Sequence, residues 1–229
     1  MNFEGKERAL SGSALKLIAM AAMVIDHVAL IFFYNNPEYS KSYVLMRTIG
    51  RISYPVFAFL IVEGYLHTHD FGRYAKRLLY FAVISEIPWQ LINHDGSHNV
   101  LFTLLAGLFV MYMIDHWHTT NINILLFAIV SGVLLIYFHT DYDCRGLLLI
   151  LVFYLFKKDP FLQTIFGILV MSFYGIRGAL LAFLVINAYN GHRGFIKGDL
   201  GKHLVYLFYP CHLMILWLIR IIIVNTIYN

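Results

Sequence analysis

Two adjacent residues, Asp26 and His27, offer acid–base chemistry inside a stretch that is otherwise apolar. Near neutral pH, an imidazole takes a proton from an attacking amine or hydroxyl, and a neighbouring carboxylate can orient the ring. Lys16 lies eleven residues before His27. In a helix this spacing puts both side chains on one face, roughly 16 Å apart. The pattern predicts a general base deep within a helix and a cation near the end of that helix that is expected to face the cytoplasm.

Two other interpretations of Asp26 and His27 remain open at this point. Adjacent helical residues point about 100° apart, so Asp26 can instead pair with an arginine on another helix. The Asp–His pair can also serve only to hold helices together.

Arg47 and Arg51 follow at a spacing of four residues, which places both guanidinium groups on one helix face. Two cations so close repel each other unless an anion or a carboxylate lies between them. Asp26 and Glu86 are the predicted partners, because both are expected in the half of the membrane that lies away from the cytoplasm. The network is either purely structural, or it holds a carboxylate, a phosphate or a developing oxyanion.

A second polar group lies near the start of the last apolar stretch, where Lys202, His203 and Tyr206 follow one another within five residues. As packing residues these side chains need no function. As part of a cavity wall they would supply donors near the inner end, close to Lys16. Pro210 interrupts the apolar run near its middle and is expected to kink the helix that carries them.

The overall composition determines the surroundings of all these groups. Hydrophobic residues make up 60% of the 229 residues, and only 13% are charged, against about 25% in a typical soluble domain. Lipid is therefore the expected solvent, and the fold class is an all-α, polytopic transmembrane helix bundle of one domain, residues 1–229. The net charge of +4 is expected to reflect basic cytoplasmic loops rather than nucleic-acid binding. The two cysteines show no metal-ligand spacing, so no metal site is predicted.

About nine helices are predicted, and eight if the region 143–190 contains two spans and a re-entrant piece. The expected ranges are 13–34, 44–66, 76–92, 99–115, 121–138, 143–157, 160–175, 177–190 and 202–224. Lysines and arginines gather at one set of loop ends in this arrangement. The bias predicts a multi-pass protein of the cell membrane with a cytoplasmic N-terminus. The first apolar stretch carries Asp26 and His27 and is expected to be a retained helix rather than a signal peptide.

Five segments together resemble the TraX family. They are Ser13–Met20 with Ile25–His27, Arg47–Gly64, Ile84–Pro88, Asn99–Thr103 and Tyr206–His212. The family is named for a conjugation protein that acetylates the N-terminus of a pilin subunit. The Lys16–His27 spacing is also similar to a motif of the acyltransferase-3 membrane enzymes. TraX-like proteins in turn resemble other transmembrane acyltransferases, which move acetyl groups from cytosolic acetyl-CoA across the bilayer.

The resemblance implies an acetyltransferase of the bacterial inner membrane with acetyl-CoA as co-substrate. The acceptor would be an extracytoplasmic amine or hydroxyl, on a peptide N-terminus, a sugar or a cell-surface polymer. The predicted catalytic residues are His27 as general base, Asp26 to orient it or to pair with arginine, Arg47 and Arg51 to stabilise charge, and Glu86. Lys16, Lys202, His203 and Tyr206 are predicted to face the coenzyme. A proton-coupled transporter and a non-catalytic membrane assembly factor are the alternatives.

Overall fold

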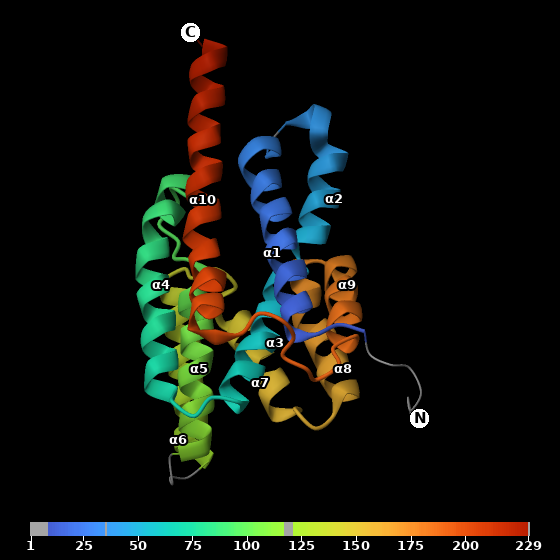
Figure 1. Ribbon diagram of the computed structural model, residues 1–229, viewed down its shortest axis with the longest axis vertical. Coiled ribbons are helices and arrows are strands. Elements are labelled where there is room, and N and C mark those ends of the chain that lie inside the picture. Colours follow the sequence, from blue (N-terminus) through green and yellow to red (C-terminus); the bar gives the residue numbers. More distant parts are fainter. Residues whose placement is uncertain (1–8, 35, 117–120, 229) are drawn as a thin grey trace.

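The computed structural model describes residues 9–34, 36–116 and 121–228 (Figure 1). Over these ranges it contains ten α-helices and no β-strand. The helices are α1 (Gly12–Val28), α2 (Ser40–Gly50), α3 (Ser53–Leu66), α4 (Phe71–Ile92), α5 (Val100–His116), α6 (Asn121–Tyr137), α7 (Asp143–Leu155), α8 (Pro160–Met171), α9 (Ile176–Asn187) and α10 (Gly198–Tyr228). A π-helical turn, Ala29–Phe33, extends α1, and short 3-10 helices lie at Pro37–Tyr39 and Ser172–Tyr174.

Helices α2 and α3 form one bent segment, Pro37–Leu66, so the described residues fold into nine helical segments. The predicted all-α bundle is therefore confirmed. The region 143–190 forms three separate helices, α7, α8 and α9, as the nine-helix arrangement predicts.

Within the described ranges, three segments are long and apolar enough to cross a membrane: Gly12–Phe33, Pro37–Leu66 and Gly198–Thr226. Helices α8 and α9 have only 12 residues each, or about 18 Å, less than the ~30 Å of a typical hydrocarbon core. Large apolar side chains are exposed along α6, among them Leu125, Ile129 and Val133. Such a face suits contact with lipid.

Successive segments run in alternating directions, and the C-terminus lies at the opposite end from the N-terminal region (Figure 1). The start of α1, the α3–α4 turn, the α7–α8 turn and the α9–α10 loop lie together at one end, called here the inner end. The lysines and arginines described at this end are Lys16, Arg73, Lys76, Arg77, Lys157, Lys158, Arg193, Lys197 and Lys202. Lys6 and Arg8, also expected there, lie outside the described residues. The cytoplasmic location of this end stays a prediction.

The start of α1 is tied to the loop between α9 and α10. The Leu10 and Tyr189 backbones form an isolated bridge. The Ser13 hydroxyl donates to the Arg193 carbonyl at 2.9 Å and accepts from the Ile196 N–H at 2.7 Å. Because these bonds join segments more than 170 residues apart, they place Arg193 beside the first turns of α1.

The bend within the segment Pro37–Leu66 falls at Arg51 and Ile52, one helical turn before Pro55. Pro55 has no N–H, so the carbonyl of Arg51 loses its helical partner at that point. Helix α10 stays helical across Pro210, as the predicted range 202–224 requires.

Candidate active site

A cavity of about 240 Å³ lies between α1, α3, α4, α5 and α10. His27, Asp26, Tyr54 and Asp141 line one end of it, and Lys16, Arg77, Arg193 and Lys202 line the other. A second, more open hollow of about 400 Å³ lies at the inner end and shares those four cationic side chains. The two hollows therefore meet at a common basic wall, called here the basic mouth.

The basic mouth combines side chains from α1, α4, the α9–α10 loop and α10. The Arg77 guanidinium lies 5.3 Å from the Tyr206 ring centre and 6.0 Å from that of Tyr74. Its buried Nε atom has no hydrogen-bond partner among the described residues. Such planar, multiply donating groups suit phosphate recognition.

The predicted residues Lys16, Lys202 and Tyr206 line this passage. His203 does not, because it points away and its Nδ1 donates to the Asp199 carbonyl at 2.7 Å. The sequence interpretation missed Arg77 and Arg193 as site residues, since both occur among loop-end cations that the topology alone explains.

The section between the mouth and His27 is mostly apolar. Its walls include Phe57, Leu60, Ile61, Leu78 and Leu104. Lys16 and His27 lie at the two ends of the same cavity, so the passage extends about 16 Å along α1, given 1.5 Å per residue.

His27 lies at the deep end, with only 8% of its surface exposed. Its Nδ1 atom lies 3.0 Å from Nε2 of His212 on α10, whose own Nδ1 lies 2.9 Å from the Phe208 carbonyl oxygen. The Trp89 ring meets the His27 ring edge-on at 6.4 Å between centres. The imidazole is thus held by α4 and α10 as well as by α1.

Asp26 pairs with arginine and makes no contact that would orient the His27 ring. Arg47 Nη1 donates to Asp26 Oδ2 at 2.5 Å. Asp26 Oδ1 has no hydrogen-bond partner among the described residues. Gly50 lets α2 approach this close, because a Cβ there would lie 2.1 Å from Asp26 Oδ1.

The two predicted arginines lie behind the cavity wall and not on it. Arg51 Nη1 donates to the Tyr142 hydroxyl at 3.3 Å, and its guanidinium lies 5.5 Å from the centre of the Tyr174 ring. Neither Arg47 nor Arg51 lines the cavity. In the described residues they pair with Asp26 and Tyr142 instead, and their role in stabilising charge during a reaction stays a prediction.

Tyr54 and Asp141 are cavity residues that the sequence interpretation missed. Tyr54 is 3% exposed, stacks on Tyr142 with 3.9 Å between ring centres, and its hydroxyl lacks a hydrogen-bond partner among the described residues. Asp141 lies in the α6–α7 turn, where burial raises the pKa of its carboxyl group to about 6 against the opposing effect of Arg51. Tyr54 lies within the segment Arg47–Gly64 that carries part of the family resemblance, and this is a sequence signal that could have pointed to it.

Four buried atoms that have no hydrogen-bond partner among the described residues therefore lie in residues that line the cavity: Asp26 Oδ1, Tyr54 Oη, Arg77 Nε and Tyr209 Oη. Buried polar atoms nearly always have hydrogen-bond partners. Their concentration along one passage indicates a site for a polar ligand. In the described part of the chain, no group of three or more His, Cys, Asp or Glu residues could hold a metal ion.

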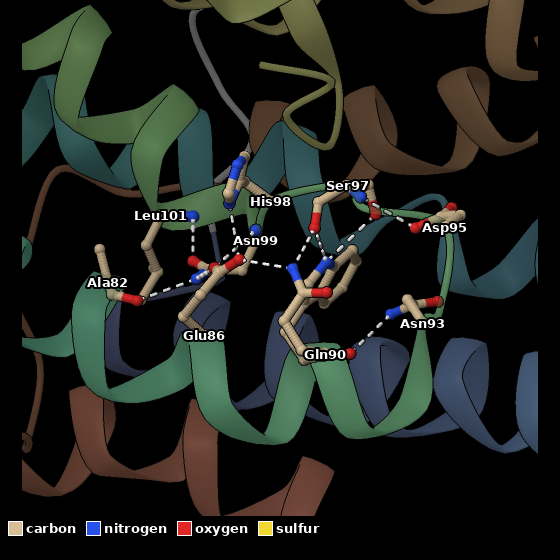
Figure 2. Close-up of polar contacts among 10 residues, drawn as sticks. Ala82, Glu86, Gln90, Asn93, Asp95, Ser97, His98, Asn99 and Leu101 are labelled. Carbon is tan, nitrogen blue, oxygen red and sulfur yellow. Dashed lines mark hydrogen bonds and ion pairs between the residues drawn. The ribbon is translucent and has the colours of Figure 1, made fainter.

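Glu86 belongs to a separate cluster at the outer end of α4, shown in Figure 2. Its Oε1 accepts from Gln90 Nε2 at 2.7 Å and from His98 Nδ1 at 2.6 Å. Its Oε2 accepts from Asn99 Nδ2 at 2.6 Å and from the Asn99 backbone N–H at 3.3 Å. The prediction that Glu86 pairs with Arg47 or Arg51 is wrong, because the α4–α5 loop folds back and supplies His98 and Asn99 first. Glu86 does not line the cavity.

Comparisons with known proteins support the predicted family resemblance. A family model described as "TraX protein" matches residues 11–220. The chain is 29% identical to the "Probable fimbrial assembly protein FimC, serogroup H1" of Dichelobacter nodosus, over 90% of this chain and 94% of that protein. It is 32% identical to an uncharacterized protein of Rickettsia prowazekii (strain Madrid E), over 43% of this chain and 35% of that protein. No solved structure matches the chain.

Proposed function

The chain belongs to the TraX family, and from that premise we propose that it is a membrane acetyltransferase. In this proposal acetyl-CoA enters at the basic mouth, and the acetyl group passes to an amine or hydroxyl acceptor that reaches His27 from the outer half of the bundle. The inner end would face the cytoplasm.

The observation that carries the proposal is the form of the passage. Four cations surround its inner end, its middle is apolar, and a buried histidine lies about 16 Å along α1 from Lys16. This form fits a donor with an anionic end and a reactive end joined by a long, slender arm. Acetyl-CoA has such a structure, with a phosphate-rich nucleotide and a thioester at opposite ends.

The chemistry follows from the groups at the deep end. His27 accepts the proton of the acceptor amine or hydroxyl, whose lone pair attacks the thioester carbonyl carbon. The new bond forms as the carbonyl oxygen gains negative charge, and the carbon–sulfur bond then breaks with release of the thiolate. The Tyr54 hydroxyl, which has no hydrogen-bond partner among the described residues, is suited to donate to that oxygen. The His27 imidazolium then gives its proton to the thiolate, so the coenzyme leaves as the free thiol and His27 is neutral again.

The direct test is to incubate the purified protein in detergent with radiolabelled acetyl-CoA and candidate peptides, sugars and amines. We expect transfer, or slow hydrolysis without an acceptor, and loss of both in His27→Ala. Absence of binding, hydrolysis and transfer in the wild-type protein would overturn the proposal.

A matched pair of arginine variants tests the basic mouth. Arg77 lines both hollows, whereas Arg73, one helical turn earlier, is exposed and pairs with Asp70 on the surface. Loss of one charge-assisted phosphate contact should raise the KM for acetyl-CoA roughly tenfold in Arg77→Ala. Arg73→Ala should leave that KM unchanged. Equal values in the two variants would place the donor elsewhere.

A non-catalytic role in the assembly of a surface structure is a second candidate. The name of the Dichelobacter nodosus relative favours it. This role predicts that His27→Ala is harmless in an assay of surface-appendage assembly, whereas the acetyltransferase requires that the variant abolish acetylation of the acceptor.

A further inference from the structure

The contact between His27 and His212 determines which nitrogen of each ring carries a proton. His212 Nδ1 lies 2.9 Å from the Phe208 carbonyl oxygen. A carbonyl oxygen only accepts hydrogen bonds, so Nδ1 of His212 is protonated and donates. In a neutral His212, Nε2 then carries a lone pair.

Only one proton can lie between two ring nitrogens that are 3.0 Å apart. His212 and His27 are 6% and 8% exposed, and such burial disfavours an imidazolium. The His212 Nε2 atom is therefore the acceptor, and His27 Nδ1–H is the donor. The carbonyl oxygen of Met23, one turn earlier on α1, is a second acceptor within reach of the His27 ring.

This arrangement leaves His27 Nε2 with its lone pair and without a hydrogen-bond partner in the described part of the chain. His27 lines the cavity, so the free nitrogen is the one that remains for a ligand there. A general base requires such a lone pair.

We propose that His212 is the positioning residue of His27, in place of the neighbouring carboxylate that usually orients a catalytic histidine. Asp26 is unavailable for that role because Arg47 engages it. The Phe208 carbonyl, His212 and His27 then form a chain of hydrogen bonds that crosses from α10 to α1. The effect of His212 on catalysis rests on the proposed function, whereas the assignment of protons to the nitrogens of His27 and His212 does not.

Two variants at position 212, with side chains of nearly equal length, distinguish the effect of the hydrogen-bond acceptor from the effect of side-chain volume. His212→Gln keeps an oxygen that can accept from His27 Nδ1–H, whereas His212→Met fills similar space without a strong acceptor. Loss of this hydrogen bond should lower kcat about tenfold in the Met variant. The KM for acetyl-CoA should not change, since the basic mouth lies at the other end of the passage. The Gln variant should retain most of the wild-type kcat.

The proton positions are measured directly by ¹⁵N NMR of protein labelled at histidine, with His27→Ala used to assign the signals. We expect protonated Nδ1 and bare Nε2 on His27 in the wild type and in His212→Gln. In His212→Met, part of the population should shift to the Nε2–H form, with Met23 still holding the remainder.

Protonated Nε2 on wild-type His27 would overturn the inference. An unchanged His27 tautomer in His212→Met would also overturn it. If the wild type transfers no acetyl group but shows the expected tautomer, the proposed function fails and the assignment of His212 stands.

Discussion

Two carboxylates carried by helices, Glu86 on α4 and Asp26 on α1, have opposite surroundings. Both oxygens of Glu86 are engaged, by Gln90, His98 and Asn99. Asp26 has one oxygen bound to Arg47 and the other unpaired, and it lines the cavity. The two residues look alike in the sequence, as single acids among apolar neighbours.

The contrast shows how a structural carboxylate differs from one at a binding site. An unsatisfied buried polar atom costs about 1–3 kcal/mol. A fully bonded cluster such as that of Glu86 avoids this cost and ties the α4–α5 loop to α4. Asp26 and Tyr54 each keep an atom that has no partner among the described residues, and both line the cavity beside His27, which is the arrangement that a polar ligand would complete.

The largest expected effect is on His27. Loss of a general base typically lowers the rate by 10²–10⁴-fold, so His27→Ala should nearly abolish acetyl transfer while the protein still folds. His98→Ala, in the Glu86 cluster, should instead lower stability and leave turnover per folded molecule nearly unchanged. Acetyl transfer and thermal unfolding in detergent measure the two effects. Similar kinetic losses in both variants would remove the distinction between the regions.

Arg47→Ala should have the next largest effect, because it leaves the Asp26 carboxylate buried without its partner. Breaking such a pair costs about 3 kcal/mol, measurable as a lower free energy of unfolding in mixed micelles. Adding Asp26→Asn should recover part of that loss, since the uncompensated charge is then gone. A double variant that is no more stable than Arg47→Ala would show that the pair contributes little.

Glu86→Gln tests the same comparison at the fully hydrogen-bonded carboxylate. The amide keeps one acceptor oxygen but directs an N–H₂ donor at the donors of its neighbours, so we expect a loss of about 2 kcal/mol in the free energy of unfolding. The kcat of the folded fraction should stay at the wild-type value. A large fall in kcat without destabilisation would support the original prediction that Glu86 is a catalytic residue.

The smallest expected effect comes from a methyl group beside Asp26. In Gly50→Ala the new Cβ would lie 2.4 Å from the Cβ of Asp26, so α1 and α2 must separate, at about 1–2 kcal/mol. Gly132→Ala is the matched control, because its Cβ would meet the Cβ of Cys144 at an ordinary 3.4 Å. Thermal unfolding distinguishes them. Equal stability would mean that the α1–α2 contact is looser than described.

The fold follows from the sequence to a large extent. Backbone polar groups in lipid must bond within their own segment, so apolar stretches of sufficient length become helices wherever they occur. The nine predicted ranges accordingly match nine helical segments. The short helices α7, α8 and α9 were the least clear, because 12 or 13 residues leave a weak apolar signal between their turns.

The candidate site was predicted only in part. The spacing of Lys16 and His27 along one helix placed them on a common face, and that geometry is local. Arg193 could not be foreseen, because it reaches the basic mouth only through the bonds between the start of α1 and the α9–α10 loop. Tyr54 looks like any other tyrosine of an apolar helix until its unpaired hydroxyl is located.

The sequence by itself determined the membrane-embedded helices, the gathering of basic residues at one end, and the face shared by Lys16 and His27. These properties depend on hydropathy and helical periodicity, which act over a few neighbouring residues. The sequence also predicted an arginine partner for Asp26. Only the tertiary structure decided that this arginine is Arg47, that Glu86 pairs with His98 and Asn99, and that His27 pairs with His212. Each pairing depends on the depth and rotation of two helices, or on how a loop folds back onto one, and no local pattern in the chain encodes that.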